Sequence, residues 1–328
     1  MGYALDPAAP LAAELRRVVT ECLDDAGAQL AGETGNDLDT RVHEARKRVK
    51  EARAVLRLVR DGSIDATLVR GWGDRLRDAS RLLAPLRDAE VLRRTMARLE
   101  VGDDEALVAA RERAVEALAA QARSERARAA QAQLVAEMAG RLAEVRDELD
   151  GWDLVEDRWR ALDPGLRRVY RQGRRRLRAA LDEPSDEALH EWRKRAKDLW
   201  YLHLLLGPAW PQVLEPVATQ AHELSDLLGD HQDLAVLADR LGDAALGLDA
   251  GERTGLEQVI RARQAALRRD AFALGERLYA EKPAAFAARL GRVWKAARRT
   301  AEPVPAPESA QAGEGEPAPG ANASEVSA

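Results

Sequence analysis

The sequence predicts an all-α protein that is internally duplicated, with pseudo-two-fold symmetry between its helical halves and a disordered C-terminal tail. Three observations support this prediction. Charged residues make up 33% of the 328 residues and aromatic residues only 4%, which is typical of a mainly helical protein. Apolar residues recur with helical periodicity along residues 7–299. One basic segment also occurs twice, at residues 42–60 and 189–206.

The two basic segments read VHEARKRVKEARAVLRLVR and LHEWRKRAKDLWYLHLLL. On a helix at about 100° per residue, each separates into a charged side and an apolar face of the width that a core-facing helix needs. Neither copy contains glycine or proline. We therefore expect two amphipathic helices, each packed by its apolar face and charged on the other.

The first segment places several cations within an arc of about 120°. These cations are Arg46, Lys47, Lys50, Arg53 and Arg57. The charged side of the second segment is shorter, because Trp200 and Leu204 replace two of the arginines. It contains His190, Arg193, Lys194, Lys197 and Tyr201. Because the acids lie off this stripe, we expect nothing on either helix to neutralise it, which favours binding of an external anion.

The first half is predicted to contain five or six helices. Residues 7–31 form the first, with Asp6 as N-cap and Pro7 at its first position. The basic helix begins at residues 37–40 and ends at 61–62. Residues 64–84 and 85–99 form two helices joined at Pro85, since proline is well tolerated in a first turn. Residues 103–149 form either one long helix or a helical pair with a turn near Gly140.

The second half begins with an arginine-rich helix at residues 163–181. Ser185 is then a suitable N-cap for the second basic helix, which ends before Gly207 and Pro208. Helices at residues 213–228, 234–241, 251–279 and 284–299 complete this half.

The two halves also agree outside the basic helices. Residues 80–92 align with 225–237 at an offset of 145, close to the offset of 147 between the basic segments. A near-constant offset indicates a duplicated unit, with halves at residues 7–150 and 151–300. Residues 301–328 consist mostly of Ala, Pro, Glu, Gly and Ser, and their five glutamates account for the whole net charge of −5. Without apolar periodicity this acidic tail is predicted to be disordered.

Several classes of protein are disfavoured. Cys22 is the one cysteine, so we expect a buried structural thiol, no disulfide and no cysteine-based zinc site. No signal peptide or long apolar run is present, which predicts a soluble cytoplasmic protein with no membrane partner. Neither the HExxH motif nor a phosphate-binding glycine loop occurs. We predict no metal, no cofactor and no catalytic residues.

Residues 166–181 carry seven arginines and no acid. Three of them, Arg171, Arg174 and Arg178, share one side of the predicted helix. They either extend an anion-binding wall or pair with acids of neighbouring helices, and the sequence leaves both interpretations open.

The paired H-E-x-R-K-R-x-K segments, each followed by an L-L-x-x-x-R/Q-D-x-x-V-L segment, resemble the CHAD family, the conserved histidine α-helical domain. The resemblance covers residues 7–299. It implies two similar helical bundles with a basic groove between them that binds inorganic polyphosphate, and association with polyphosphate granules. The binding residues that it implies are His43, Arg46, Lys47, Lys50, His190, Arg193, Lys194 and Lys197.

The chain departs from the family pattern in two places. Many relatives carry an adjoining triphosphate-tunnel domain with an E-x-E-x-K motif, which is absent here, so no catalytic role follows from that domain. Gln232 stands where the first repeat has Arg87, so the two positions are not equivalent.

The function that this sequence predicts is binding of inorganic polyphosphate. Polyphosphate carries about one negative charge per phosphate and no base, and a mixed row of Arg, Lys and His suits such a chain. A phosphohydrolase, or a regulatory subunit of one, is the alternative of a different class. Nucleic-acid binding is a weaker third hypothesis, because the seven tryptophans are scattered and lie mostly on apolar faces.

Overall fold

The computed structural model describes residues 2–131, 133–156 and 158–301. In these ranges the chain forms eleven α-helices and one isolated β-bridge, between Ser63 and Leu154, but no strand. The all-α prediction is therefore confirmed. The acidic tail predicted at residues 301–328 lies outside the described residues except for Ala301, the last residue of the final helix.

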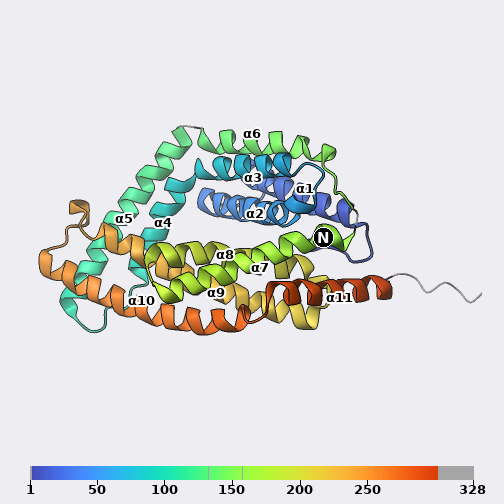
Figure 1. The fold of residues 1–328 in the computed structure, drawn as a ribbon. Coiled ribbons are helices and arrows are strands. Elements are labelled where there is room, and N and C mark those ends of the chain that lie inside the picture. The colour runs from blue at the N-terminus through green and yellow to red at the C-terminus, as the bar shows by residue number, and fades with distance from the viewer. Residues whose placement is uncertain (1, 132, 157, 302–328) are drawn as a thin grey trace, which may run out of the picture.

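Four helices form the upper set in Figure 1. They are α1 (Leu11–Ala31), α2 (Leu38–Val59), α3 (Ala66–Arg81) and α6 (Leu134–Asp147). α1 packs against α2 and α6, and α3 packs against the same two helices. The basic helix predicted from the first segment is α2, and Asp37 caps it by accepting a hydrogen bond from the backbone N–H of Thr40.

A lower set lies beneath these helices in Figure 1. It contains α7 (Asp163–Asp182), α8 (Asp186–Leu206), α9 (Pro211–Arg240) and α11 (Pro283–Ala301). α8 packs against α7 and α9, while α11 packs against α7. α8 is the second basic helix, and the predicted N-cap is confirmed, since the Ser185 side chain accepts a hydrogen bond from Ala188 N–H.

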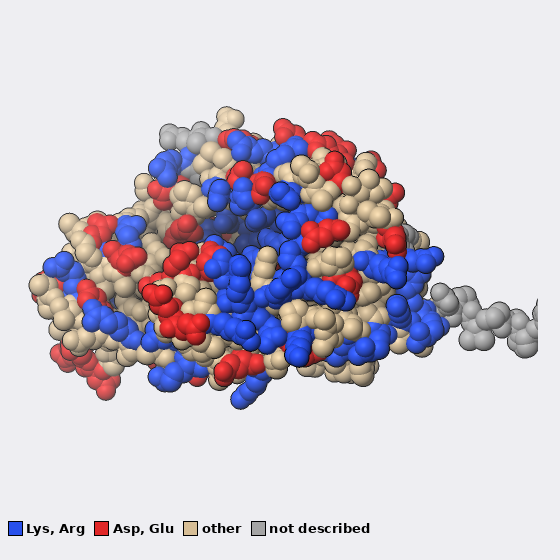
Figure 2. Space-filling model, in the orientation of Figure 1, with Lys and Arg blue, Asp and Glu red and all other residues tan. Residues whose placement is uncertain are grey.

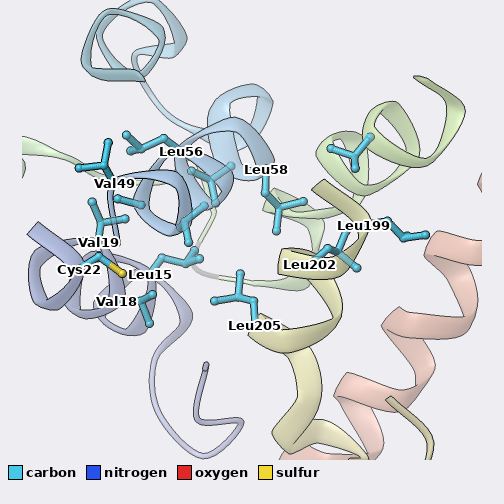
Figure 3. Close-up of a cluster of buried hydrophobic side chains, with 14 of the residues drawn as sticks. Leu15, Val18, Val19, Cys22, Val49, Leu56, Leu58, Leu199, Leu202 and Leu205 are labelled. Atoms are coloured by element: carbon cyan, nitrogen blue, oxygen red, sulfur yellow. The ribbon is translucent and has the colours of Figure 1, made fainter. Parts of the chain in front are cut away.

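One hydrophobic core joins the upper and lower sets. It contains Leu15 of α1, Val49 and Leu56 of α2, and Leu199 and Leu202 of α8, all at most 4% exposed. Figure 3 shows these side chains converging from the three helices. Burial of this apolar surface is the main force that holds the two sets together. The division into halves at residue 150, and the symmetry between them, remain predictions.

A second core lies at the left of Figure 1, in a part of the molecule that we call the arm. The arm consists of α4 (Ala84–Ala97), α5 (Glu105–Gln131), the C-terminal part of α9, and α10 (Ala250–Leu278). Its buried side chains include Met96, Leu118, Leu237 and Ile260. Helices from both predicted halves therefore share this core.

Two boundaries differ from the sequence prediction. α1 begins at Leu11 rather than at residue 7, because Pro10 has extended backbone angles (φ −58°, ψ 130°) and takes the N-cap position in place of Asp6. α5 and α6 are separate helices, but their junction includes Gln133, which has a left-handed φ of 53°. Gly140 instead lies inside α6, because an isolated glycine weakens a helix without ending it.

The prediction of two short helices at residues 213–228 and 234–241 is wrong, because α9 runs through both ranges without a break. Gly229 lies inside this helix, where a Cβ atom would be 2.8 Å from Nη2 of Arg193. Glycine here leaves space for the arginine. At the corresponding place in the first half the helix is interrupted: α3 ends at Arg81, and Pro85 lies in the first turn of α4, as predicted.

Cys22 is buried at 3% exposure and makes no disulfide, as the sequence predicts. Across the described part of the chain, none of the helices combines the length and the apolar character that a bilayer crossing requires.

Candidate functional site

Cations from three helices converge between the upper and lower sets. They lie on α2, α4 and α8, and α2 packs directly against α8. We call this group the basic cluster, and it consists of Arg46, Lys50, Arg87, Arg193 and Lys197. The charges of the other four all act on Lys50. Figure 2 shows a hollow between the two sets of helices that is lined by Lys and Arg.

The two lysines at the centre of the cluster have perturbed pKa values. Burial, together with the charges of Lys197 and Arg46, lowers the pKa of Lys50 to about 7. Burial likewise lowers the pKa of Lys197 to about 8, with contributions from Arg193 and Arg87. Neither ammonium group forms an ion pair within 4 Å in the described residues. Both are therefore cations held out of water without a paired anion.

Arg46 and Arg193 occupy equivalent positions in the two segments, and each is anchored to the helix that follows. The Arg46 guanidinium donates a hydrogen bond to the carbonyl oxygen of Ser80. Nη1 of Arg193 lies 4.0 Å from an oxygen of Asp233, and its side chain is 16% exposed. Nε of Arg193 is buried and has no hydrogen-bond partner among the described residues. This N–H is thus a buried, unpaired donor within the cluster.

The two histidines stand at the N-terminal end of the cluster. Burial lowers the pKa of both His43 and His190, and the cations beside them lower it further. The His43 side chain is 68% exposed. Nδ1 of His190 is buried without a hydrogen-bond partner in the described structure. Each imidazole is thus mostly neutral at pH 7 and can donate one N–H to an oxyanion.

Lys47 and Lys194 lie at the rim, with side chains 42% and 46% exposed. Each is paired with the glutamate three residues before it on its own helix. Lys47 Nζ lies 3.7 Å from Glu44, and Lys194 donates a hydrogen bond to Glu191. The expectation that nothing on either helix neutralises the stripe is therefore wrong at these two positions.

In the C-terminal part of the first stripe, the cations already bind other groups of the protein. Arg53 Nε donates to the Gly73 carbonyl oxygen at 3.0 Å, and burial lowers the pKa of Arg53 to about 10. Arg57 forms an ion pair with Asp198 of α8, whose carboxylate is 6% exposed. Arg195 also reaches Asp198, at 2.9 Å. An acid of the second segment thus neutralises a cation of the first, which periodicity within one helix does not reveal.

The structure does not bring the remaining predicted residues into the cluster. Tyr201 is 4% exposed, stacks on Trp200 with ring centroids 4.7 Å apart, and lies in the core. On α7, Gln172 and Arg176 are the side chains that reach α8. At 100° per residue, the opposite side of α7 carries Arg171, Arg174 and Arg178.

Arg87 is the member of the cluster that the sequence prediction omits. It lies on α4 with a side chain 34% exposed, and its charge acts on His43, Arg46, Lys50, Arg193 and Lys197. The sequence does contain a signal for Arg87. The alignment of residues 80–92 with 225–237 places it in the repeated segment that follows the basic helix.

The chemistry of the cluster suits an anion with several negative groups. Five cations of two types converge from three helices, and at least one buried donor is unpaired. In the described residues, no three side chains of His, Cys, Asp or Glu lie together in an arrangement that could hold a metal ion.

A family model described as CHAD domain matches residues 17–242. The match begins within α1 and ends just after α9, so it includes both basic helices and α4. No curated protein matches the chain.

Proposed function

This chain belongs to the CHAD domain family, and from that premise we propose that it binds inorganic polyphosphate through the basic cluster. The family is associated with polyphosphate- and triphosphate-binding proteins. The observation that carries the proposal is the pair Lys50 and Lys197. Their ammonium groups are half-buried between α2 and α8 with no paired anion among the described residues.

Burying these two charges costs free energy. A cation held away from water without a partner is destabilised, which is why the pKa values of both lysines fall. A bound polyanion supplies the missing negative charge and recovers that cost. Arginine adds forked donors for phosphate oxygens and lysine adds a mobile point charge.

Polyphosphate fits this arrangement better than a compact anion does. The cations follow helices, and one helical turn of about 5.4 Å is near the length of two phosphate units in an extended chain. Five of the seven tryptophans, the side chains best suited to stacking on bases, are buried. Trp72, Trp192 and Trp294 are each at most 1% exposed. A polyanion without bases is therefore the favoured ligand over single-stranded nucleic acid.

Calorimetric titration with long-chain polyphosphate in the presence of a chelator tests the proposal. The double variant Lys50→Gln/Lys197→Gln should lose at least about tenfold in affinity. The charge-matched control is Lys282→Gln/Lys295→Gln. It removes one exposed lysine just before α11 and one on α11, and it should bind like the unmodified protein. Binding should weaken steeply between low and moderate salt, because each phosphate contact releases counterions.

Three results would contradict the proposal. Equal binding by both double variants would remove the cluster as the site. RNA of matched charge that competes as well as polyphosphate would favour the nucleic-acid alternative. Release of orthophosphate that the chelator stops would favour a metal-dependent phosphohydrolase.

We further propose that the protein associates with polyphosphate granules in the cytoplasm. The proposed ligand and the family's association with polyphosphate-binding proteins both support this location. A fluorescent fusion should coincide with stained granules, and the Lys50→Gln/Lys197→Gln fusion should be diffuse. An unmodified fusion that is diffuse in granule-rich cells would contradict the proposed location.

A further inference from the structure

A pocket of about 980 Å³ lies in the arm, beside the basic cluster. It is bounded by α4, by residues 99–102 and by the facing parts of α9 and α10. We call it the arm pocket. Its lining combines apolar side chains, among them Val91, Leu99, Leu234, Val259 and Leu267, with three arginines and three carboxylates. A pocket of this size with apolar walls and convergent polar groups can hold a small organic molecule.

The arm pocket adjoins the basic cluster at α9. Asp233 lines the pocket, and the same carboxylate lies 4.0 Å from Nη1 of Arg193. Asp230 also lines the pocket, and the charges of Arg193 and Arg263 both act on it. The ligand environment therefore changes in order from the cations of the cluster to two carboxylates and then to a cavity in which apolar side chains alternate with three arginines and Glu100.

Two arginines of the arm pocket have unused donors. Arg98 and Arg263 form no side-chain hydrogen bond and no ion pair with any described residue, whereas Arg94 is paired with Glu90 at 2.7 Å. A planar guanidinium can stack on an aromatic ring as well as donate hydrogen bonds. The pocket thus offers both apolar walls and stacking groups for a flat ring.

From this order of groups we infer that the arm pocket and the basic cluster together bind a purine nucleoside polyphosphate. The phosphates contact the cations around Arg193, the ribose hydroxyls donate to Asp230 and Asp233, and the purine lies between α4 and α10. The phosphate half of this site rests on the proposed function, and the nucleoside half is new.

The two carboxylates explain why a nucleoside is favoured over more phosphate. They accept hydrogen bonds from hydroxyl and amine groups. The three arginines of the pocket are balanced by three carboxylates, Asp230, Asp233 and Glu100, so the pocket offers a bare phosphate chain no net attraction. Burial of a purine against Val259 and Leu234 gives a nucleotide an additional favourable contribution.

Titration with ATP, tripolyphosphate and adenosine, all with a chelator, tests this inference. ATP should bind about tenfold or more tightly than tripolyphosphate, which has the same number of phosphates. Ala266→Trp fills the pocket from α10 and should remove this advantage. Ala273→Trp places the same ring at an exposed position of α10 outside the pocket and should keep it. Circular dichroism establishes that both variants are folded.

The outcomes separate this inference from the proposed function. Equal affinity for ATP and tripolyphosphate in the unmodified protein would overturn the nucleoside half alone. If Ala266→Trp weakens long-chain polyphosphate as much as ATP, the pocket is part of the polyphosphate path and the inference is wrong. If none of the phosphate ligands binds, both proposals fail together.

Discussion

Arg57 of α2 forms an ion pair with Asp198 of α8, which joins the two basic helices directly. Asp198 is 6% exposed and also forms an ion pair with Arg195, at 2.9 Å. The two ends of the basic stripe on α2 therefore have different roles. Its first turns contribute Arg46 and Lys50 to the cluster, and its last turn holds the two sets of helices together.

Asp198→Ala should destabilise the protein without removing a cluster cation. The change leaves Arg57 and Arg195 facing each other without their shared anion. Breaking a buried ion pair costs about 3–5 kcal/mol, and we expect about 2–3 kcal/mol here because both arginines are partly exposed. Urea unfolding measures the loss. The control Asp78→Ala removes an exposed carboxylate of α3 and should change the free energy of unfolding by less than about 0.5 kcal/mol.

Polyphosphate affinity should fall as pH rises from 7 to 9. A bound polyanion favours the charged amines, so binding raises the pKa of Lys50 above about 7 and that of Lys197 above about 8, with uptake of protons. Calorimetry in buffers of different ionisation enthalpy counts these protons. Lys50→Arg/Lys197→Arg keeps the charges and should bind with much less proton uptake. Equal uptake by this variant would assign the protons to other groups.

Stability of the ligand-free protein should change with pH in the opposite sense. Lys50 has an ordinary pKa of about 10.4 when unfolded and about 7 when folded, so between these values the unfolded state holds more protons. The destabilisation is complete below pH 7 and is relieved as pH rises through 7 to 10. The free energy of unfolding at pH 7 and 9 measures it. Lys50→Gln should flatten this dependence, and an unchanged slope would contradict the assignment.

Arg87→Gln should weaken polyphosphate binding by about five- to tenfold, since one cation of the cluster is lost. The change reproduces the residue found at the aligned position 232 and leaves an uncharged polar side chain. Arg81→Gln is the matched control, because that arginine is 70% exposed and pairs with Asp78 on α3. Loss of affinity in both variants alike would indicate only a general effect of net charge.

Gly229→Ala should weaken binding by displacing Arg193. The new Cβ would lie 2.8 Å from Nη2 of the arginine, so the guanidinium has to move. Gly140→Ala on α6 is the control, because a Cβ there meets nothing within 4 Å and alanine should stabilise that helix by about 0.5–1 kcal/mol. Titration of both variants, with urea unfolding beside it, separates the effect on the site from the effect on the helix.

The helical elements could be predicted largely from local patterns. The apolar faces of α2 and α8 recur at helical spacing and are buried as expected, as Val49 and Leu199 show. Ser185 and Pro85 mark helix starts through the chemistry of their own side chains. The prediction for α9 is wrong because local sequence patterns treat a glycine such as Gly229 as a helix break. In the structure the helix continues through Gly229, and the missing side chain leaves space for Arg193.

The composition of the site was only partly predictable. Arg46, Lys50, Arg193 and Lys197 share one face of a repeated helix, so the sequence identifies them. Arg57 was assigned to the ligand because its partner Asp198 lies 141 residues away and only tertiary packing brings the two together. Periodicity also placed Tyr201 on the charged side of its helix and left two interpretations open for the arginines of α7, because it gives the side of a helix but not which neighbour covers it.

The shared core of the arm has a consequence for synthesis of the chain. Met96 and Leu118 leave the ribosome long before their partners Leu237 and Ile260 on α9 and α10. Until α10 arrives, the nascent hairpin of α4 and α5 exposes an apolar surface that its own half does not cover. This stretch is thus the part of the growing chain that most needs a chaperone, and a product truncated before α10 would be prone to aggregate through it.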